Sequence, residues 1–402
     1  MGKNCMIELN QNRRAFLRFL AASPALPVAV RELWAQDASA LLKDPSQALS
    51  VFDFEVAARA VLPPANLGYL VSGVDDEMTL KANREGFQQY KLRARRLVDV
   101  SKTDLTTESM GIHLDHPILV CPVGGQMAFH ADGELGTARG AAATKTQMIL
   151  STQTTKPIED VIKAAGRPIW FQLYTSSKWD VTERLVKHAE DAGASVVAFT
   201  VDQQGGRNTE TGTRLRSKDT RNCATCHEGG QPQTFRQYKP MYNGIDTNGL
   251  GLVNSALTWD AVDRLRKATK MKVVLKGIVT REDAALAREH GADGVIVSNH
   301  GGRAEESGRG TIECLPEVLE GAASMPVMID GGFRRGTDIY KALALGARAA
   351  GVGRPYVWGL SAFGQAGVEK VLNMLQAELA MTMRQLGTPT IRSITKNAII
   401  HA

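Results

Sequence analysis

The chain has 402 residues, of which 43% are hydrophobic, so it can bury one large core or several small ones. Its formal net charge at pH 7 is +6, and its basic residues are scattered along the sequence. The densest basic cluster, at residues 91–96, has no aromatic platform and precedes an apolar run at 97–100 that is typical of a strand. We therefore expect a solvated protein face there and no nucleic-acid interface.

The first forty residues have the features of an export signal. The run NRRAFLR at residues 12–18 resembles the twin-arginine motif, and an apolar stretch and small residues at 38–40 follow it. An arginine and two prolines interrupt the apolar stretch, which is too short to span a bilayer as a helix. We predict that residues 1–40 are a twin-arginine signal and that the protein is periplasmic, with an ordinary basic amphipathic helix as the alternative.

The rest of the chain has the pattern of a parallel barrel. Residues 51–92 are helical in pattern, with breaks at Pro63-Pro64 and Gly73. Apolar runs separated by helical and loop signals follow at 118–121, 148–151, 169–173, 196–201, 272–276, 294–298, 327–330 and 349–353. Such runs indicate parallel strands covered on the outside, and eight of them predict an α/β fold with a closed (β/α)8 TIM barrel over residues 41–400. An open doubly wound sheet is the alternative, although no GxGxxG motif opens the first unit.

One connection is far longer than the others. Roughly seventy residues separate the fourth and fifth apolar runs, and residues 203–254 are rich in Gly, Asn, Thr, Gln and Arg with little periodicity. Because this segment follows the C-terminal end of a strand, we predict an inserted loop or lid on the catalytic face. From residue 368 to residue 386 the chain returns to an amphipathic helix.

Residues 273–303 form a predicted βαβ unit whose strand ends carry titratable side chains. The first run ends at Lys276, a helix capped by Thr280 follows, and the second run leads into the sequence SNHGGR. The C-terminal ends of parallel strands lie on one face, so Lys276, His300 and Arg303 should meet there. Such a cluster is typical of a barrel active site.

This stretch closely resembles the FMN-dependent 2-hydroxy-acid oxidases and dehydrogenases, the family of glycolate oxidase, lactate oxidase, mandelate dehydrogenase and flavocytochrome lactate dehydrogenase. The combination of Lys-Gly with Ser-Asn-His-Gly-Gly-Arg is specific, and the resemblance extends over roughly residues 50–400. It implies an enzyme that binds FMN and oxidises a small 2-hydroxy acid to the 2-keto acid. Electrons would pass to oxygen or to a respiratory acceptor such as a cytochrome or quinone. Relatives are commonly homotetramers, so the resemblance implies a homotetramer too.

The resemblance assigns residues at the strand ends to the cofactor. Lys276 would lie beside the N1/O2 edge of the flavin, where a fixed cation stabilises the negative charge of the reduced ring. The glycine-rich ends of the seventh and eighth strands would hold the ribityl chain and the phosphate through backbone amides and arginines. The implied cofactor residues are Pro122, Val123, Gly124, Ser151, Gln172, Thr200, Lys276, Ser298, Asp330, Gly332, Arg334, Gly353 and Arg354.

The same resemblance implies the catalytic and substrate-binding residues. His300 matches the catalytic base, which would take either the hydroxyl proton or the C2 proton, since imidazole titrates near neutral pH. Asp202 matches the carboxylate that steadies the protonated imidazole, and Tyr174 matches a catalytic tyrosine facing the substrate hydroxyl. Tyr69 and Arg303 would bind the substrate carboxylate, for which a guanidinium offers two parallel hydrogen bonds.

Two positions depart from the family pattern near the substrate. Relatives usually carry a second arginine in a Gly-x-Arg-Glu arrangement, whereas here Arg207 is the candidate, and its register relative to Asp202 is shifted by two residues. Either Arg207 reaches the substrate carboxylate from this position or the substrate is held differently. After Arg303 the family usually reads Gln-Leu-Asp, whereas this chain reads Ala-Glu-Glu at residues 304–306.

The insertion also contains the sequence CATCH, with Cys223, Cys226 and His227. CxxCH is the attachment motif of c-type haem, in which the cysteines hold the porphyrin and the histidine binds iron. Haem would fit an exported protein and would give reduced FMN an electron outlet, but the insertion is short and has few apolar residues. A disulfide or thiol pair and a zinc site are the alternatives. Cys121 and Cys314 are expected to be small core residues.

The sequence thus predicts an exported FMN-dependent 2-hydroxy-acid dehydrogenase or oxidase with no transmembrane segment. Two other functions compete with it. One is a related FMN barrel of the isopentenyl-diphosphate isomerase type, against which His300 and Arg303 argue. The other is a periplasmic electron-transfer protein that works through haem at the cysteine motif, and its function would survive loss of His300.

Overall fold

The computed structural model describes residues 42–221, 238–251 and 254–402. Contacts divide the chain into a first unit, residues 1–43, and a second unit, residues 44–402, which carries the fold described below. The predicted signal at residues 1–40 and the haem candidates Cys223, Cys226 and His227 lie outside the described residues.

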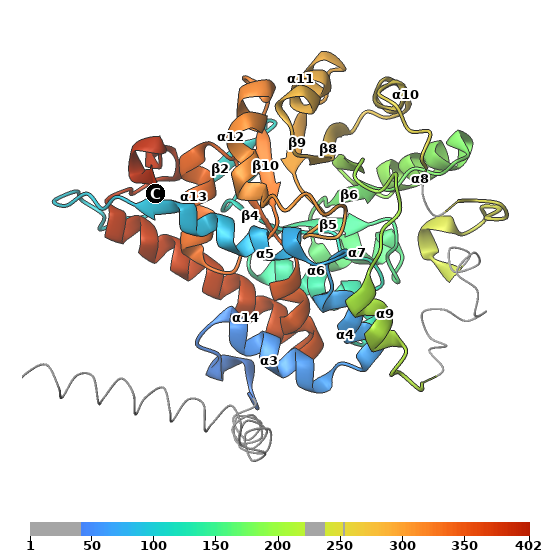
Figure 1. Cartoon of the computed structure of the whole chain (residues 1–402), viewed down its shortest axis with the longest axis horizontal. Helices are drawn as coiled ribbons and strands as arrows, with labels where there is room; N and C mark the ends of the chain where they lie inside the picture. The colour runs from blue at the N-terminus through green and yellow to red at the C-terminus, as the bar shows by residue number, and fades with distance from the viewer. Residues whose placement is uncertain (1–41, 222–237, 252–253) are drawn as a thin grey trace, which may run out of the picture. The chain divides into compact units, whose positions relative to one another are not determined.

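Eight parallel strands form a closed barrel at the centre of the second unit (Figure 1). Their order around the barrel is β10, β11, β4, β5, β6, β7, β8 and β9. The strands are β4 Ile118–Val120, β5 Gln147–Ser151, β6 Trp170–Leu173, β7 Val196–Thr200, β8 Lys272–Ile278, β9 Gly294–Val297, β10 Val327–Asp330 and β11 Ala350–Val352. Each strand overlaps one of the apolar runs, so the predicted (β/α)8 barrel is confirmed and the open sheet is excluded.

Helices cover the outside of the barrel. They are α6 Gly133–Ala143, α7 Ile158–Ala165, α8 Trp179–Asp191, α10 Asp260–Ala268, α11 Arg281–Glu289, α12 Thr311–Ala322, α13 Gly336–Leu345 and α14 Arg354–Leu386. The backbone of α14 leaves helical geometry at Phe363 and Gly364, so the helix expected at 368–386 is the second half of a kinked pair that begins directly after β11. No helix within the described ranges combines the length and apolar character needed to cross a membrane.

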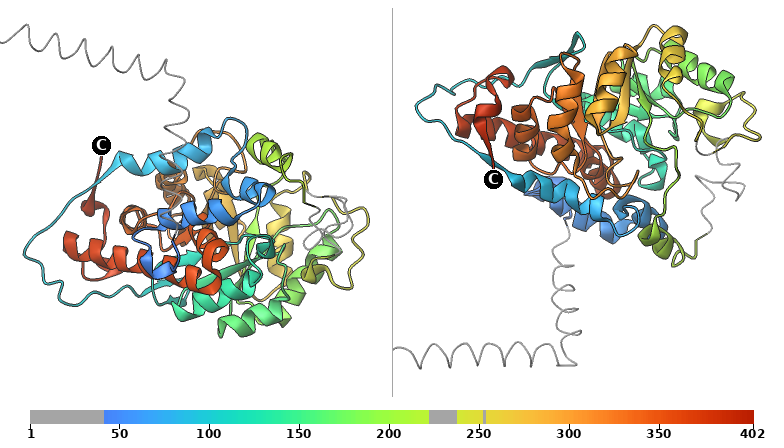
Figure 2. Two further views of the ribbon diagram at one scale, coloured as in Figure 1. Left: turned by 90° about the horizontal axis from the view of Figure 1, so that it is seen from below. Right: turned by 45° about the horizontal axis from the view of Figure 1, so that its top comes forward.

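The predicted helical segment before the barrel forms three helices and a short strand. These are α3 Val51–Val61, α4 Pro64–Val71, α5 Met78–Glu85 and β1 Tyr90–Leu92. Helix α3 packs against α14, as two views show (Figures 1 and 2), and β1 pairs with β12 Ile399–His401 near the C-terminus. The strand expected at 97–100 is wrong, because Leu97 has a φ of +59° and is fully exposed, and the local strand lies upstream as β1.

The barrel interior is filled at its N-terminal end and open to ligands at its C-terminal end. Leu119, Ile149, Trp170, Val274 and Met328 belong to its buried core. The hairpin of β2 Thr107–Ser109 and β3 Ile112–Leu114 packs against this core through partly buried apolar side chains. The chemistry of the site is therefore concentrated where the strands end.

The insertion after β7 carries secondary structure that its composition did not indicate. It contains α9 Glu210–Arg216, which packs against α4, and a 3-10 turn at Pro240–Tyr242. Met241 and Tyr242 of this turn are buried. The described part of the insertion thus contributes side chains to the interior of the protein.

Candidate active site

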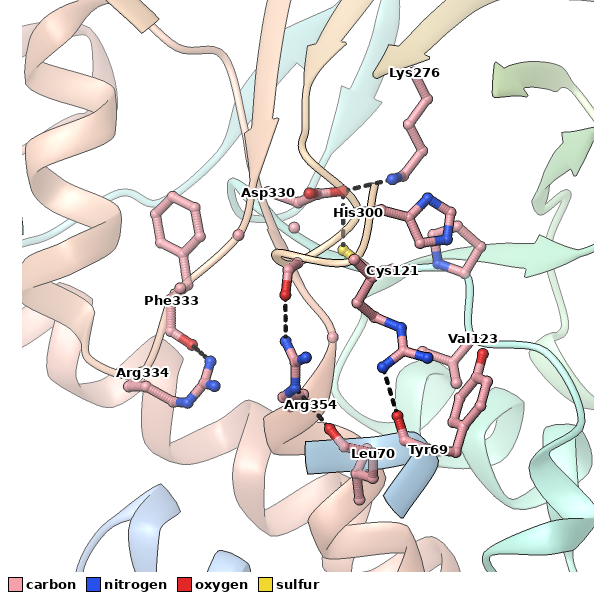
Figure 3. Close-up of a pocket in the computed structure, with 17 residues that line it drawn as sticks. Tyr69, Leu70, Cys121, Val123, Lys276, His300, Asp330, Phe333, Arg334 and Arg354 are labelled. Carbon is pink, nitrogen blue, oxygen red and sulfur yellow. Dashed lines mark hydrogen bonds and ion pairs between the residues drawn. The ribbon is translucent and has the colours of Figure 1, made fainter. Parts of the chain in front are cut away.

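A cavity opens at the C-terminal end of the barrel (Figure 3). The lining comes from α4, from strands β8, β10 and β11, and from the segments that follow β4, β9, β10 and β11. It consists of Tyr69, Leu70, Cys121, Pro122, Val123, Lys276, His300, Gly301, Arg303, Asp330, Gly331, Gly332, Phe333, Arg334, Gly351, Gly353 and Arg354.

Lys276, Ser298 and Asp330 form a buried hydrogen-bonded group at the ends of three neighbouring strands. Lys276 Nζ lies 3.1 Å from Asp330 Oδ2 and donates to Ser298 Oγ at 2.8 Å. The Ser298 hydroxyl donates to Asp330 Oδ1 at 2.7 Å and accepts the backbone N–H of His300 at 3.2 Å. Burial opposes the charge on Lys276, but Asp330 and Asp202 outweigh it and raise the pKa of this lysine. Lys276 is therefore a fixed cation at the cavity wall.

His300 is held at both ring nitrogens. Nδ1 lies 2.9 Å from Asp202 Oδ1, and Nε2 lies 3.1 Å from the hydroxyl of Tyr174. Burial lowers the pKa of His300, although the Asp202 carboxylate acts in the opposite direction, so the ring is neutral at neutral pH. Burial also opposes ionisation of Asp202, but the His300 contact outweighs it and lowers the pKa of that carboxyl. The Asp202 contact assigns the proton to Nδ1, which leaves Nε2 as the basic nitrogen.

The loop that carries His300 is folded by left-handed backbone. His300, Gly301 and Gly302 have φ values of +58°, +69° and +76°. A Cβ on Gly302 would lie 2.6 Å from Cα of Leu80 in α5, so the glycine permits a close approach. This approach places the histidine ring and the following Arg303 at the cavity.

Ser151, Gln172 and Thr200 form a hydrogen-bonded row across β5, β6 and β7. Ser151 Oγ donates to Gln172 Oε1 at 3.0 Å, and Gln172 Nε2 donates to Thr200 Oγ1 at 2.9 Å. All three side chains are buried. The structure thus brings these predicted cofactor residues together, but they are not among the residues that line the cavity, and neither is Gly124.

Two arginines, Arg334 buried and Arg354 half-buried, lie in one half of the cavity. Arg334 donates to the carbonyl of Phe333 at 2.9 Å and stacks on Trp358, and Arg354 donates to three backbone carbonyls. Among the described residues, neither has a carboxylate partner. Burial lowers the pKa of Arg334 to about 10 and that of Arg354 to about 9. Because a buried cation among neutral groups is stabilised by an anion, and α14 begins at Arg354, this half suits a phosphate group.

Arg303 marks the other half, beside His300. Its Nη1 donates to the carbonyls of Tyr69 and Ser72 and to the Ser72 hydroxyl, and its guanidinium stacks 4.7 Å from the Tyr69 ring. Arg207 is exposed, yet its charge lowers the pKa of His300 and Arg303 after the larger effect of burial. The shifted register therefore still places Arg207 on the same face as His300.

Three features of the site were not predicted from the sequence. Cys121, expected to be a core residue, is buried but lines the cavity, with Sγ 3.7 Å from Asp330 Oδ2. Burial and the neighbouring Asp330 raise the pKa of its thiol. Gln153 lies at the same rim, where its Nε2 donates to the Tyr242 hydroxyl of the insertion. The position of Gln153, two residues after Ser151 at a strand end, was a usable signal, whereas nothing marked Tyr242.

Comparison with known proteins agrees with this geometry. The family described as FMN-dependent dehydrogenase matches residues 58–401. Peroxisomal (S)-2-hydroxyacid oxidase GLO3 of Arabidopsis thaliana is 37% identical over 356 residues, which cover 88% of this chain and 96% of the relative. L-lactate oxidase of a Nostoc species is 38% identical over 361 residues, 87% of this chain and 97% of the relative. The crystal structure of the monotopic membrane protein (S)-mandelate dehydrogenase has a TM-score of 0.80 at 31% identity, covering 89% of this chain and 100% of its own. This chain therefore belongs to the FMN-dependent dehydrogenase family, as its sequence motifs predict.

Proposed function

We propose that this protein oxidises a small 2-hydroxy acid to the 2-keto acid with FMN bound in the cavity at the C-terminal end of its barrel. The observation that carries the proposal is His300, a neutral imidazole with Nδ1 fixed by Asp202 and Nε2 facing the Tyr174 hydroxyl, between the cations Lys276 and Arg303. When bound, FMN supplies the acceptor for the two electrons that the substrate loses.

The residues of the cavity fit FMN by their chemistry. The guanidinium groups of Arg334 and Arg354 have no carboxylate partner in the described part of the chain, so they suit the phosphate. Lys276 is a buried cation that suits the edge of the ring where negative charge accumulates on reduction. Other residues of this proposed site are Pro122, Val123, Gly124, Ser151, Gln172, Thr200, Ser298, Asp330, Gly332 and Gly353.

Arg303 and Arg207 would bind the substrate carboxylate, with the Tyr69 ring beside Arg303. The three hydrogen bonds that Arg303 makes within the described residues all use Nη1, so the rest of its fork is available for an anion. Two positive charges on one side of His300 orient the substrate carboxylate away from Asp202. Carbon 2 and its hydroxyl then face His300 and Tyr174.

His300 Nε2 would take one proton of the substrate, either from the hydroxyl or from carbon 2. The protonated ring is stabilised by Asp202, whose carboxylate keeps its charge because its pKa is lowered by His300. Burial, with Tyr69 and Asp202, raises the pKa of Tyr174, so the phenol keeps its proton and donates to an oxygen at the reacting centre. Oxidation of the hydroxy acid removes two protons and two electrons, and the chain supplies the base for the first proton.

The test is keto-acid formation by the FMN-loaded protein with lactate, glycolate and mandelate. Wild type should form the 2-keto acid and bleach the flavin absorption, and His300→Ala should lose at least about 100-fold in rate. His113→Ala, at an exposed residue of β3, is the matched control and should keep the wild-type rate. The proposal fails if no 2-hydroxy acid is oxidised, or if His300→Ala retains the activity. The isomerase-type alternative predicts no keto acid from any of the three.

For the cellular context we propose twin-arginine export to the periplasm and a respiratory electron acceptor. The NRRAFLR motif at residues 12–18 supports export. A variant with Arg13→Lys and Arg14→Lys should accumulate in the cytoplasm when fractions are probed for flavin, and an unchanged distribution would argue against this route. Oxygen consumption compared with reduction of a cytochrome or a quinone identifies the acceptor. A homotetramer, proposed by analogy with relatives, is tested by the solution mass.

The sequence CATCH at residues 223–227 supports a second candidate function, a haem-bearing electron-transfer protein. Protein from a host that attaches c-type haem should then show a covalent haem band that sharpens when a 2-hydroxy acid is added. Cys223→Ser should remove the band. Flavin bands without haem would leave the cysteines as a thiol pair or disulfide.

A further inference from the structure

The part of the insertion that carries Arg207 is tied to the segment that follows α4. The carbonyl of Asn208, the next residue, accepts the backbone N–H of Asp75 at 3.0 Å. The side chain of Asn208 contacts the same residue, because its Nδ2 donates to Asp75 Oδ1 at 3.1 Å. Hydrogen bonds are directional, so two of them between one pair of residues hold the chain beside Arg207 in one orientation.

The insertion continues along α4 after Asn208. Helix α9 packs against α4, and the two backbones approach closely at glycines. A Cβ on Gly68 would lie 3.1 Å from the carbonyl oxygen of Gly212, and a Cβ on Gly212 would lie 3.2 Å from Ser72 Oγ. After α9, Asp219 Oδ2 accepts the N–H of Ala65 in the first turn of α4 at 3.0 Å. The insertion is thus held at both ends of α4.

The same stretch of chain holds Arg303, the other arginine proposed for the substrate carboxylate. Ser72, the residue after α4, accepts from Arg303 Nη1 at its carbonyl at 2.7 Å and at its hydroxyl at 3.0 Å. Two residues later, the N–H of Val74 donates at 3.1 Å to the carbonyl of the residue directly before Arg303. Residues 72–75 therefore link the loop of Arg303 to the segment of Arg207.

This link has a physical consequence for Arg207, whose side chain is exposed. An exposed arginine on an aperiodic segment loses conformational freedom when it binds an anion, and this loss opposes binding. A segment that is already fixed by hydrogen bonds has less freedom to lose. The contacts of Asn208 should therefore strengthen the binding of an anion by Arg207.

We propose that Asp75 and Asn208 are positioning residues that hold Arg207 where it binds the carboxylate of the 2-hydroxy acid. The inference rests on the proposed function and names the contacts that compensate for the shifted register of Arg207 relative to Asp202. Neither Asp75 nor Asn208 lines the cavity, so both act through Arg207. The substrate keeps its carboxylate throughout the reaction, so the pair should affect KM more than kcat.

The test is a double-mutant cycle between this pair and Arg207, measured with whichever of lactate, glycolate and mandelate the wild type oxidises fastest. Asp75→Ala and Asn208→Ala each remove the side-chain hydrogen bond and should each raise KM by about 3- to 10-fold with kcat nearly unchanged. In an Arg207→Met background, either change should alter KM by less than about twofold. Asp75→Asn keeps an oxygen that accepts from Asn208 and should retain most of the wild-type affinity. Asp76→Ala, at the neighbouring exposed carboxylate, is the matched control and should leave KM unchanged.

Binding of oxalate to the FMN-loaded protein gives a second readout that does not depend on turnover. Oxalate has the carboxylate of a 2-hydroxy acid but no hydrogen to transfer, and its dissociation constant follows from the change in flavin absorption. This constant should rise in Asp75→Ala and Asn208→Ala by the same factor as KM, and it should not rise further in the Arg207→Met background. Bound FMN and the melting temperature show whether each variant is folded, and Asn208→Ala decides the matter if Asp75→Ala is not.

Two failures are distinguishable. If wild type forms no keto acid from any of the three acids, the proposed function itself is wrong. If wild type oxidises one of them but folded Asp75→Ala and Asn208→Ala keep its KM and its oxalate affinity, the positioning inference is overturned and the proposed function stands. The same conclusion follows if the two variants lose affinity equally with and without Arg207, or if Arg207→Met alone leaves KM unchanged.

Discussion

Gly277 sets the position of the carboxylate that holds His300. It lies in β8 between Lys276 and Ile278, where the pairing with β9 shifts register, and its φ is +112°. A Cβ at this position would lie 2.7 Å from Cβ of Asp202 and 3.1 Å from its backbone nitrogen. The substitution Gly277→Ala must therefore displace Asp202, whose Oδ1 lies 2.9 Å from His300 Nδ1.

The size of the effect follows from the contact that is lost. A hydrogen bond to a charged group contributes about 1.5–3 kcal/mol, which corresponds to a loss of roughly 10- to 150-fold in kcat/KM when the imidazolium forms. Asp202 acts to raise the pKa of His300 against the effect of burial, so displacing it should lower that pKa further. The acid limb of the kcat/KM profile should then move to lower pH while the plateau falls.

The assay is the pH profile of keto-acid formation by FMN-loaded protein, with Gly193→Ala as the matched control. Gly193 has a φ of +101°, and a Cβ there would meet no atom within 4 Å. Both variants should therefore lose about 1–2 kcal/mol of stability through backbone strain, but only Gly277→Ala should lose activity. In an Asp202→Asn background, Gly277→Ala should cause little further loss of activity, because both substitutions act on the same contact with His300. An equal activity loss in both glycine variants, or an acid limb that stays in place in Gly277→Ala, would refute the reasoning.

Three further predictions test charge in the buried parts of the molecule. Lys276→Met should lower the urea-unfolding free energy of the apoprotein by about 3–5 kcal/mol because the Asp330 carboxylate loses its buried cation. The double variant with Asp330→Leu should recover part of this lost stability. A double variant that recovers none would contradict the pairing of Lys276 with Asp330. Arg334→Met should weaken FMN binding by roughly 10- to 100-fold in a fluorescence titration, unlike Arg348→Met at an exposed site. Burial lowers the pKa of His116 from 6.5 to about 4. Between these two pH values the unfolded chain binds a proton at His116 that the folded protein does not bind. The free energy of unfolding should therefore fall by up to about 3 kcal/mol from pH 6.5 to pH 4. Urea unfolding of His116→Gln at the same pH values should show a smaller loss of stability. An unchanged pH dependence would mean that a group other than His116 causes the loss.

The barrel could be read from the sequence because its strands are covered on both faces. The residues of β5, β6 and β7 are all buried, so each strand is a mostly apolar run that stands out from the helices. The polar residue that ends each run then falls at the C-terminal mouth, which is why Lys276, Ser151 and Asp330 could be grouped before any contact was known. The short strands β1 and β12 lack this signal, since they pair with each other on an exposed edge and come from opposite ends of the domain.

The contacts of the insertion were beyond sequence reasoning for a different reason. Lys239 and Tyr242 belong to no motif, and they reach the turns after β4 and β5 only through the path of the insertion. Arg207 shows the same limit, since its shift relative to Asp202 leaves two outcomes open. Its charge near His300 favours the outcome in which it reaches the substrate carboxylate. Strand periodicity fixes where a strand ends, but it does not fix the path of an aperiodic insertion above it.

The positions of the charged side chains in the cavity link the fold to the ligands that it can bind. Lys276 is paired with Asp330, whereas Arg303 and Arg334 are buried, and Arg354 half-buried, without a carboxylate partner among the described residues. Their guanidinium groups donate to backbone carbonyls and keep their positive charge at two separate places, one beside His300 and one at the start of α14. Such charge favours one anion next to the base and another farther along the cavity. A substrate carboxylate and a cofactor phosphate meet this requirement, and the isoalloxazine ring between them would stand against Lys276.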